Sequence, residues 1–189
     1  MQINNSNLEK ELPLTSNNLI KILDDWKIIY KSYSHEPVMT VKEAKFVQEE
    51  IFGLDNSNGH IKNLYLRDKR KNNILLVAHQ DALIDLKLLS KIIKMERLSF
   101  GSPNRLFENL GVLPGAVSPF AMINGAKTGV SLFLDNNLKS FSKIYAHPLE
   151  NDKTLEISIK QLEKFFEKIT VIPNWINLSS IDNCKTYYQ

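Results

Sequence analysis

A lysine inside an apolar stretch is the first residue of the sequence that could do chemistry. Lys62 stands in the run HIKNLYL at residues 60–66. Because alternate residues of a strand share a face, Lys62 falls on the side of Leu64 and Leu66, while Asn63 falls on the other side. A lysine among leucines must find an anion, lose its charge or extend its ammonium to water. The pattern predicts a lysine in a pocket, and an edge-strand lysine that reaches solvent is the equally open alternative.

A glycine between two prolines is the second candidate. In the segment GVLPGAVSPF at residues 111–120, Gly115 follows Pro114 directly and precedes Pro119 by four positions. Glycine lets the backbone approach a ligand closely, and the prolines hold the loop rigid. Rigid backbone amides stabilise an oxyanion well because they need no reorganisation. A plain structural turn is the alternative interpretation of this loop.

A histidine in the run YAHPLEN at residues 145–151 is the third candidate. At the end of an expected strand, the imidazole of His147 could orient a water molecule or hydrogen-bond a substrate, and a structural role is the alternative. The other histidines, at positions 35, 60 and 79, lack the spacing to Asp, Glu or Cys that a metal site needs. No serine stands in a nucleophile elbow. We therefore expect neither a metal nor another cofactor.

The elements that must position these residues follow from hydrophobic spacing and capping signals. Thr40 with Glu43, and Ser158 with Gln161, predict two helices that begin with a capping box, the second ending near residue 169. Other helices are expected at residues 17–26, 86–93 and 102–111. Strands are expected at residues 28–33, 61–66, 74–78, 130–134, 143–146 and 155–157, and residues 112–124 are expected to form an ordered loop that leads into a strand.

This order mixes hairpins with helices and lacks regular βαβ alternation, which predicts an α+β fold with a mixed sheet. The 189 residues are the size of one domain. We expect a flexible leader at residues 1–15, the folded domain at residues 16–173 and a polar C-terminal tail at residues 174–189. No glycine-rich phosphate loop of the Walker or Rossmann type is present.

Composition narrows the class of protein further. The chain is 43% hydrophobic and 24% charged, within the ordinary globular range. It has neither an apolar run long enough to span a bilayer nor an apolar signal core at its start, so we expect a cytoplasmic protein without a membrane partner. The single cysteine, Cys184, can form neither an internal disulfide nor a multi-cysteine metal site.

Positive charge is concentrated in one part of the chain. Residues 60–97 hold nine Lys or Arg against four Asp or Glu, a local charge of +5 in a chain whose net charge is +3. Such an excess suits a phosphate-bearing partner. A solvated lysine-rich surface is the alternative that charge alone favours.

Four segments, in this order, resemble the YbaK/prolyl-tRNA-synthetase-associated domain family. They are IKNL at 61–64, RLSFGSP at 97–103, LGVLPGAVSPF at 110–120 and HPLEN at 147–151. The sequence is most similar to the free-standing prolyl-tRNA editing (ProX-like) branch, over residues 17–172. HEP at 35–37 and TVKEA at 40–44 look like that branch as well.

The resemblance implies an α+β domain with a mixed, partly barrel-like sheet flanked by helices. It also implies a hydrolase that cleaves the ester between a small amino acid and the terminal adenosine of tRNA(Pro). Lys62, Gly115 and His147 match the family's functional lysine, GxxxP loop and late histidine, and are expected to act in catalysis. The expected substrate-binding residues are Asn63, Ala116, Pro119 and Val47.

Within this family, alanine on tRNA(Pro) is the expected substrate. Removing cysteine from tRNA(Pro), or binding tRNA or a nucleotide without catalysis, are the alternatives. An active site of the synthetase that fits proline can reject alanine only weakly, because a missing methylene is worth only about 1–3 kcal/mol of binding free energy. A second, hydrolytic site that admits only the smaller amino acid is therefore needed. We expect Lys62 to bind the phosphate or ribose end, and the Gly115 and Ala116 amides to stabilise the oxyanion. Val47, Phe46 or Ile51 would line the amino-acid pocket, and prolyl-tRNA synthetase is a further candidate partner.

Overall fold

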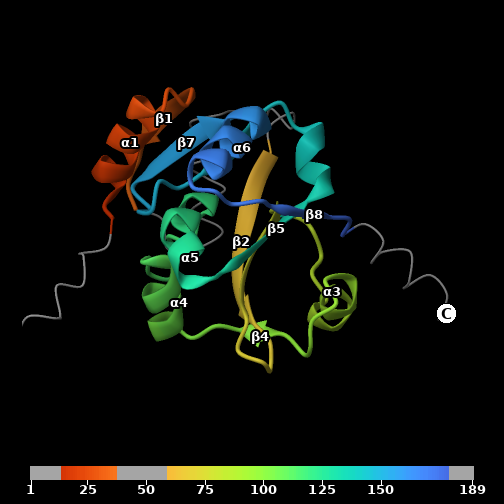
Figure 1. Ribbon diagram of the computed structural model, residues 1–189. Coiled ribbons are helices and arrows are strands. Elements are labelled where there is room, and N and C mark those ends of the chain that lie inside the picture. The colour runs from red at the N-terminus through yellow and green to blue at the C-terminus, as the bar shows by residue number, and fades with distance from the viewer. Residues whose placement is uncertain (1–13, 38–58, 179–189) are drawn as a thin grey trace, which may run out of the picture.

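The computed structural model describes residues 14–37 and 59–178 (Figure 1). Within these ranges, eight strands form one mixed sheet in the order β1-β7-β6-β2-β3-β5-β8, with β4 paired to β2. The strands are β1 (Tyr30–Ser34), β2 (Gly59–Arg67), β3 (Asn73–His79), β4 (Ser99–Phe100), β5 (Ser131–Asp135), β6 (Ile144–Ala146), β7 (Lys153–Ile157) and β8 (Asn174–Ile176). The expected α+β class with a mixed sheet is confirmed. The sheet runs from β1 to β8 and does not close into a barrel.

Helices cover both faces of this sheet. The α-helices are α1 (Ser16–Asp25), α3 (Leu86–Ile92), α4 (Pro103–Leu110), α5 (Met122–Thr128) and α6 (Ile159–Lys168), and two short 3₁₀ helices are η1 (Pro119–Ala121) and η2 (Asn136–Ser140). One apolar cluster joins α1, α4, α5 and α6 to the first face, and a smaller one joins α3 to the second face. In Figure 1, α3 accordingly lies across the sheet from α4 and α5. Each fully buried leucine or phenylalanine contributes about 1.5–3 kcal/mol to this packing.

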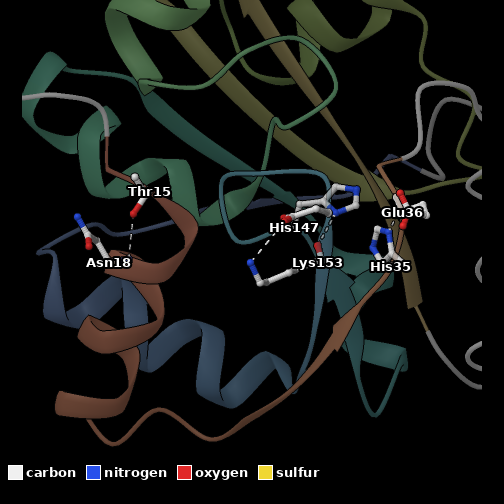
Figure 2. Close-up of polar contacts among 7 residues, drawn as sticks. Thr15, Asn18, His35, Glu36, His147 and Lys153 are labelled. Carbon is white, nitrogen blue, oxygen red and sulfur yellow. Dashed lines mark hydrogen bonds and ion pairs between the residues drawn. The ribbon is translucent and has the colours of Figure 1, made fainter.

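Caps place the helix ends where the sequence predicts them. The Ser158 hydroxyl accepts a hydrogen bond from the Gln161 amide at 3.3 Å at the start of α6. Ser102 caps α4 in the same way, and Gly111 ends that helix in the left-handed region with φ 68°. Thr15 caps α1 by accepting a bond from the Asn18 amide at 3.2 Å (Figure 2).

The expectation for residues 112–124 is wrong in part, because helical structure replaces the predicted approach to a strand. The buried Ser118 hydroxyl accepts a bond from the Phe120 amide and begins η1, and α5 follows directly. The two prolines and Gly115 make that stretch look like a loop, and Gly125 follows it within α5. In the fold it lies against α4, where an added Cβ would stand 2.8 Å from Leu110 Cδ2. The glycine therefore permits close packing of two helices, which only the tertiary contact reveals.

The expected start of the tail, at residue 174, also needs correction. Asn174–Ile176 form β8, which pairs in parallel with β5, and Leu178 beyond it is buried. The polar Asn174 that suggested a tail donates its side-chain N–H to the Leu132 carbonyl at 3.1 Å. Residues 179–189, including Cys184, lie outside the described residues, as do the helix predicted from Thr40 and the pocket residues around Val47. No helix in the described part of the chain is long and apolar enough to cross a membrane.

Candidate active site

Lys62 lies in β2 on the face that the strand pattern predicted. Leu64 and Leu66 on its side pack in the cluster with α3, and Tyr65 on the other side packs in the larger cluster. The Lys62 ammonium donates a hydrogen bond to the carbonyl of Ala82, in the connection between β3 and α3. Burial lowers the pKa of Lys62, and the negative charge of Asp81 partly offsets this. The lysine is thus a half-buried cation.

The pairing of β2 with β6 ends just before Lys62, after two residue pairs. Their parallel register is Gly59 with Ile144 and His60 with Tyr145, and it ends there. The rings of His60 and Tyr145 stack with centroids 4.8 Å apart, so these two side chains share a face. Counting two residues further along each segment brings Lys62 level with His147 on that face. Beyond this point β2 continues along β3 while the other segment turns toward β7.

His147 is held in one tautomer. Its Nδ1 lies 2.9 Å from the carbonyl oxygen of Lys153 (Figure 2). Because a carbonyl oxygen only accepts, Nδ1 must carry the proton, and in the neutral ring Nε2 is the acceptor. Burial lowers the pKa of His147; the bond to Lys153 raises it, and nearby His35 lowers it further. In the described ranges no hydrogen-bond partner meets Nε2, so His147 offers a neutral acceptor near pH 7.

The Gly115–Pro119 loop begins with a type II turn. The Ala116 amide donates to the Leu113 carbonyl at 3.0 Å, Pro114 and Gly115 are the two central residues, and Gly115 has φ 91°. The turn therefore requires both the proline and the glycine. It also engages the Ala116 amide, so the sequence expectation that this amide is an oxyanion donor does not match the structure. Gly115 carries the loop's remaining expected donor.

The same loop is packed against the connection between β6 and β7. An added Cβ on Gly115 would lie 3.9 Å from Asn151 Nδ2, in ordinary contact. Ala116 is buried in the larger cluster, and the fully buried Ser118 caps the turn that Pro119 begins. The loop thus stands next to the segment that carries His147, and its apolar residues anchor it to the core.

Asn63 points to the opposite face of β2 from Lys62. Its neighbours on that face, Ile61 and Tyr65, pack in the cluster that contains Ala116. The side-chain oxygen of Asn63 is buried and meets no hydrogen-bond partner among the described residues. A buried acceptor without a donor is costly, and a ligand that supplies a donor would relieve that cost.

The described residues therefore bring Gly115 to the His147 segment. The register of β2 and β6, continued by two residues, puts Lys62 and His147 on one face. The described residues join Lys62, Gly115 and His147 by no direct hydrogen bond or ion pair. Among the same residues, no group of three or more His, Cys, Asp or Glu side chains could hold a metal ion. Sequence reasoning missed two neighbours, His35 and Asn151. The HEP and HPLEN segments had marked both positions, but without a role.

The α+β domain combines a half-buried lysine, a histidine acceptor and a rigid Pro-Gly turn, an arrangement that suits a small hydrolytic domain. The family model of the aminoacyl-tRNA editing domain matches residues 35–165, and the chain belongs to that family. It is a hydrolase that acts on the ester bond of aminoacyl-tRNA.

Two relatives and two solved structures are consistent with this assignment. The prolyl-tRNA editing protein ProX of Acetoanaerobium sticklandii is 39% identical over 147 residues, which cover 77% of this chain and 87% of the relative. The prolyl-tRNA synthetase associated domain-containing protein 1 of Danio rerio is 28% identical over 141 residues, 74% of each protein. A structure described as a candidate trans-editing enzyme for prolyl tRNA synthetase has TM-score 0.62 and 14% identity, covering 86% of this chain and 96% of that one. The crystal structure of hypothetical protein APE2540 has TM-score 0.64 and 18% identity, covering 84% and 97%. These two structures share the fold.

Proposed function

We propose that this protein acts in trans on mischarged tRNA(Pro) and hydrolyses Ala-tRNA(Pro). The observation that carries the proposal is the parallel register of β2 with β6, which ends at His60 and Tyr145, two residues before Lys62 and His147. The identity of 39% to a prolyl-tRNA editing protein supports tRNA(Pro) as the substrate RNA. A cation (Lys62), a hydrogen-bond acceptor (His147) and a backbone donor (the Gly115 amide) suit an ester at the end of a tRNA, whose phosphates are negatively charged.

His147 has the protonation state that this reaction needs. The ester of an aminoacyl-tRNA is already activated, so a positioned water can attack the carbonyl carbon without a protein nucleophile. The bare Nε2 of His147 accepts a hydrogen bond from that water or from the free ribose hydroxyl, because Nδ1 is bound to Lys153. The bond between carbonyl carbon and ribose oxygen then breaks, the amino acid leaves as its carboxylate, and the ribose oxygen takes up a proton.

Three other groups bind the substrate around this acceptor. The Gly115 amide stabilises the oxyanion that develops on the carbonyl oxygen. The Asn63 oxygen, buried without a partner, accepts a hydrogen bond from the α-ammonium group or a ribose hydroxyl. Lys62 binds the terminal phosphate or ribose as a cation, and a phosphate at that place would keep the lysine protonated against the effect of burial.

Selection of alanine follows from size. A pocket that admits alanine and excludes the proline ring distinguishes mischarged from correctly charged tRNA. The active site of the synthetase, which is large enough for proline, makes this distinction poorly. Val47 remains our candidate for the wall of this pocket, although it lies outside the described residues. Cys-tRNA(Pro) is the alternative substrate in the same class, because a thiol adds only one heavy atom to alanine.

A deacylation assay tests the proposal directly. The purified protein is incubated with Ala-, Cys- and Pro-tRNA(Pro), without synthetase, and amino-acid release is measured against the buffer rate. Fast release of alanine alone supports the proposal, whereas fast release of cysteine alone reassigns the substrate. If none of the three is released above the buffer rate while the protein still retards tRNA in a gel, the chain is a binding module. Release that requires added prolyl-tRNA synthetase would show that the two proteins act together.

A further inference from the structure

A second histidine, His35, lies beside His147, and both are hydrogen-bonded to the segment of residues 152–154 at the start of β7. The ring centroids of His35 and His147 are 6.0 Å apart and tilted by 60°. Figure 2 shows the two imidazoles near each other, His35 at the end of β1 and His147 after β6. No pattern in the sequence links these positions, which are more than a hundred residues apart. Their proximity results from the antiparallel pairing of β7 with both strands.

Within the described residues, the hydrogen bonds of His35 go to Asp152, to Thr154 and to its own neighbour Glu36. The His35 main-chain N–H donates to the Asp152 carbonyl at 3.0 Å. Its ring Nδ1 lies 2.9 Å from the Glu36 carbonyl, so this nitrogen carries the proton. Its Nε2 then accepts the hydrogen bond of the Thr154 hydroxyl, at 2.9 Å. His35 therefore fixes the residues on both sides of Lys153.

The tautomer of His147 depends on Lys153, because the Lys153 carbonyl accepts the hydrogen bond of the His147 Nδ1–H group. If the main chain at 152–154 moved, that carbonyl would turn away, and the imidazole of His147 could rotate or change tautomer. The acceptor at Nε2 would then be lost or misdirected. Thr154 is buried, so an unmet hydroxyl there would be costly and the bond to His35 is expected to persist.

We propose that His35 is a positioning residue for the editing reaction: through Thr154 and the Asp152 carbonyl, it holds the Lys153 carbonyl that sets the tautomer of His147. The inference rests on the proposed function only where activity is concerned, because the tautomer of His147 can be observed without substrate. His35 itself takes no part in proton transfer in this scheme, since both ring nitrogens are engaged.

Three variants with a matched control test the proposal. His35→Leu removes the acceptor for Thr154, and Thr154→Val removes the donor from the other side. His35→Gln keeps an acceptor in reach of the Thr154 hydroxyl and is the conservative rescue. Tyr33→Phe is the control, because it deletes a different side-chain bond between β1 and β7, the 2.8 Å contact with Glu156, and leaves His35 intact. Thermal melts establish that each variant folds.

Two measurements read the result. Ring ¹⁵N shifts of His147 report its tautomer, and initial rates of alanine release under multiple-turnover conditions give kcat and KM. We expect His35→Leu and Thr154→Val to mix the tautomers and lower kcat on the order of tenfold with little change in KM, because a misplaced acceptor weakens only the chemical step. His35→Gln and Tyr33→Phe should keep the tautomer and the rate.

The double variant His35→Leu/Thr154→Val separates one shared bond from two independent effects. Its loss should match that of either single variant, since both remove the same contact. A single Nδ1–H tautomer and an unchanged kcat in His35→Leu would overturn the proposal, as would an equal loss in Tyr33→Phe. If the wild-type protein releases no amino acid, the proposed function fails, and the ¹⁵N shifts alone still decide the role of His35. Should His35→Leu not fold, Thr154→Val and His35→Gln carry the comparison.

Discussion

Replacing Gly115 by alanine tests whether the Pro-Gly turn does chemistry or only shapes the chain. Among the described residues, the added Cβ would meet only Asn151 Nδ2, at 3.9 Å, so contacts with these neighbours do not oppose it. The cost comes from the backbone, because φ is 91° and an L-residue in the left-handed region costs about 1–2 kcal/mol. The alanine can avoid this cost if the turn changes from type II to type I.

That change would reverse the proposed oxyanion donor. Between the two turn types, ψ of the first central residue changes by roughly 150° and φ of the second by roughly 170°. These rotations flip the peptide that joins Pro114 to residue 115, so the N–H of residue 115 points to the other side. Loss of one oxyanion-hole donor lowers kcat on the order of 100-fold or more. We expect a loss of this size in Gly115→Ala.

Gly129→Ala is the matched control. Gly129 has φ 77° and nothing within 4 Å of an added Cβ, and it ends α5. Its backbone cost is therefore also about 1–2 kcal/mol, which in a chain of this length lowers Tm by roughly 2–4 °C per kcal/mol. Urea unfolding and single-turnover deacylation of both variants complete the test. Equal turnover in the two variants would refute the role of the Gly115 amide. Gly115→Asn, which tolerates positive φ, should retain more activity than Gly115→Ala.

Three further predictions concern charge. Lys62→Ala should remove most deacylation, while thermal melting shows that the fold survives; wild-type turnover in this variant would contradict its assignment. Burial lowers the pKa of His147 from its usual 6.5, so the imidazole stays neutral as the pH falls to 6.5. The acid limb of the pH profile of kcat/KM should therefore lie below pH 6.5. A limb centred above 6.5, after subtraction of the buffer rate, would argue against His147 as the acceptor. Changing two exposed lysines of α3 to glutamine should reduce the salt dependence of tRNA binding, because α3 has no acidic residues that repel phosphate. Changing two exposed lysines of α6 should not, because glutamates lie between them. Equal effects of the two pairs would exclude α3 as a phosphate contact. The α3 pair is Lys87 and Lys91, and the α6 pair is Lys160 and Lys168.

Much of the fold was predictable because its signals are local. The cap at Ser158 and the glycine stop at Gly111 lie within a few residues of the helix ends that they set. The alternation around Lys62 likewise predicts the face that it occupies. The resemblance to a known family then supplied roles that spacing alone left open.

What could not be predicted depends on contacts between distant segments. The packing of Gly125 against Leu110 and the bond of Asn174 to the Leu132 carbonyl decide two elements, and neither partner is visible from the local sequence. The amide of Ala116 looked available until the turn to Leu113 was seen. The link between His35 and the segment after His147 arises only from the order of strands in the sheet.

The adjacent residues Lys62 and Asn63 explain why the site lies where two strands part. Successive side chains of a strand point to opposite faces, so one ligand can meet both only at a gap in the plane of the sheet. The pairing of β2 with β6 ends past the His60–Tyr145 pair, and strand alternation puts Lys62 on one face and Asn63, whose neighbours pack in the cluster that contains Ala116, on the other. An aminoacyl end bound where this pairing ends would meet the cation and the histidine acceptor from one side, and the Asn63 oxygen and the Gly115 amide from the other. A shift of β2 by one residue would exchange the two faces, and the long pairing of β2 with β3 prevents that shift.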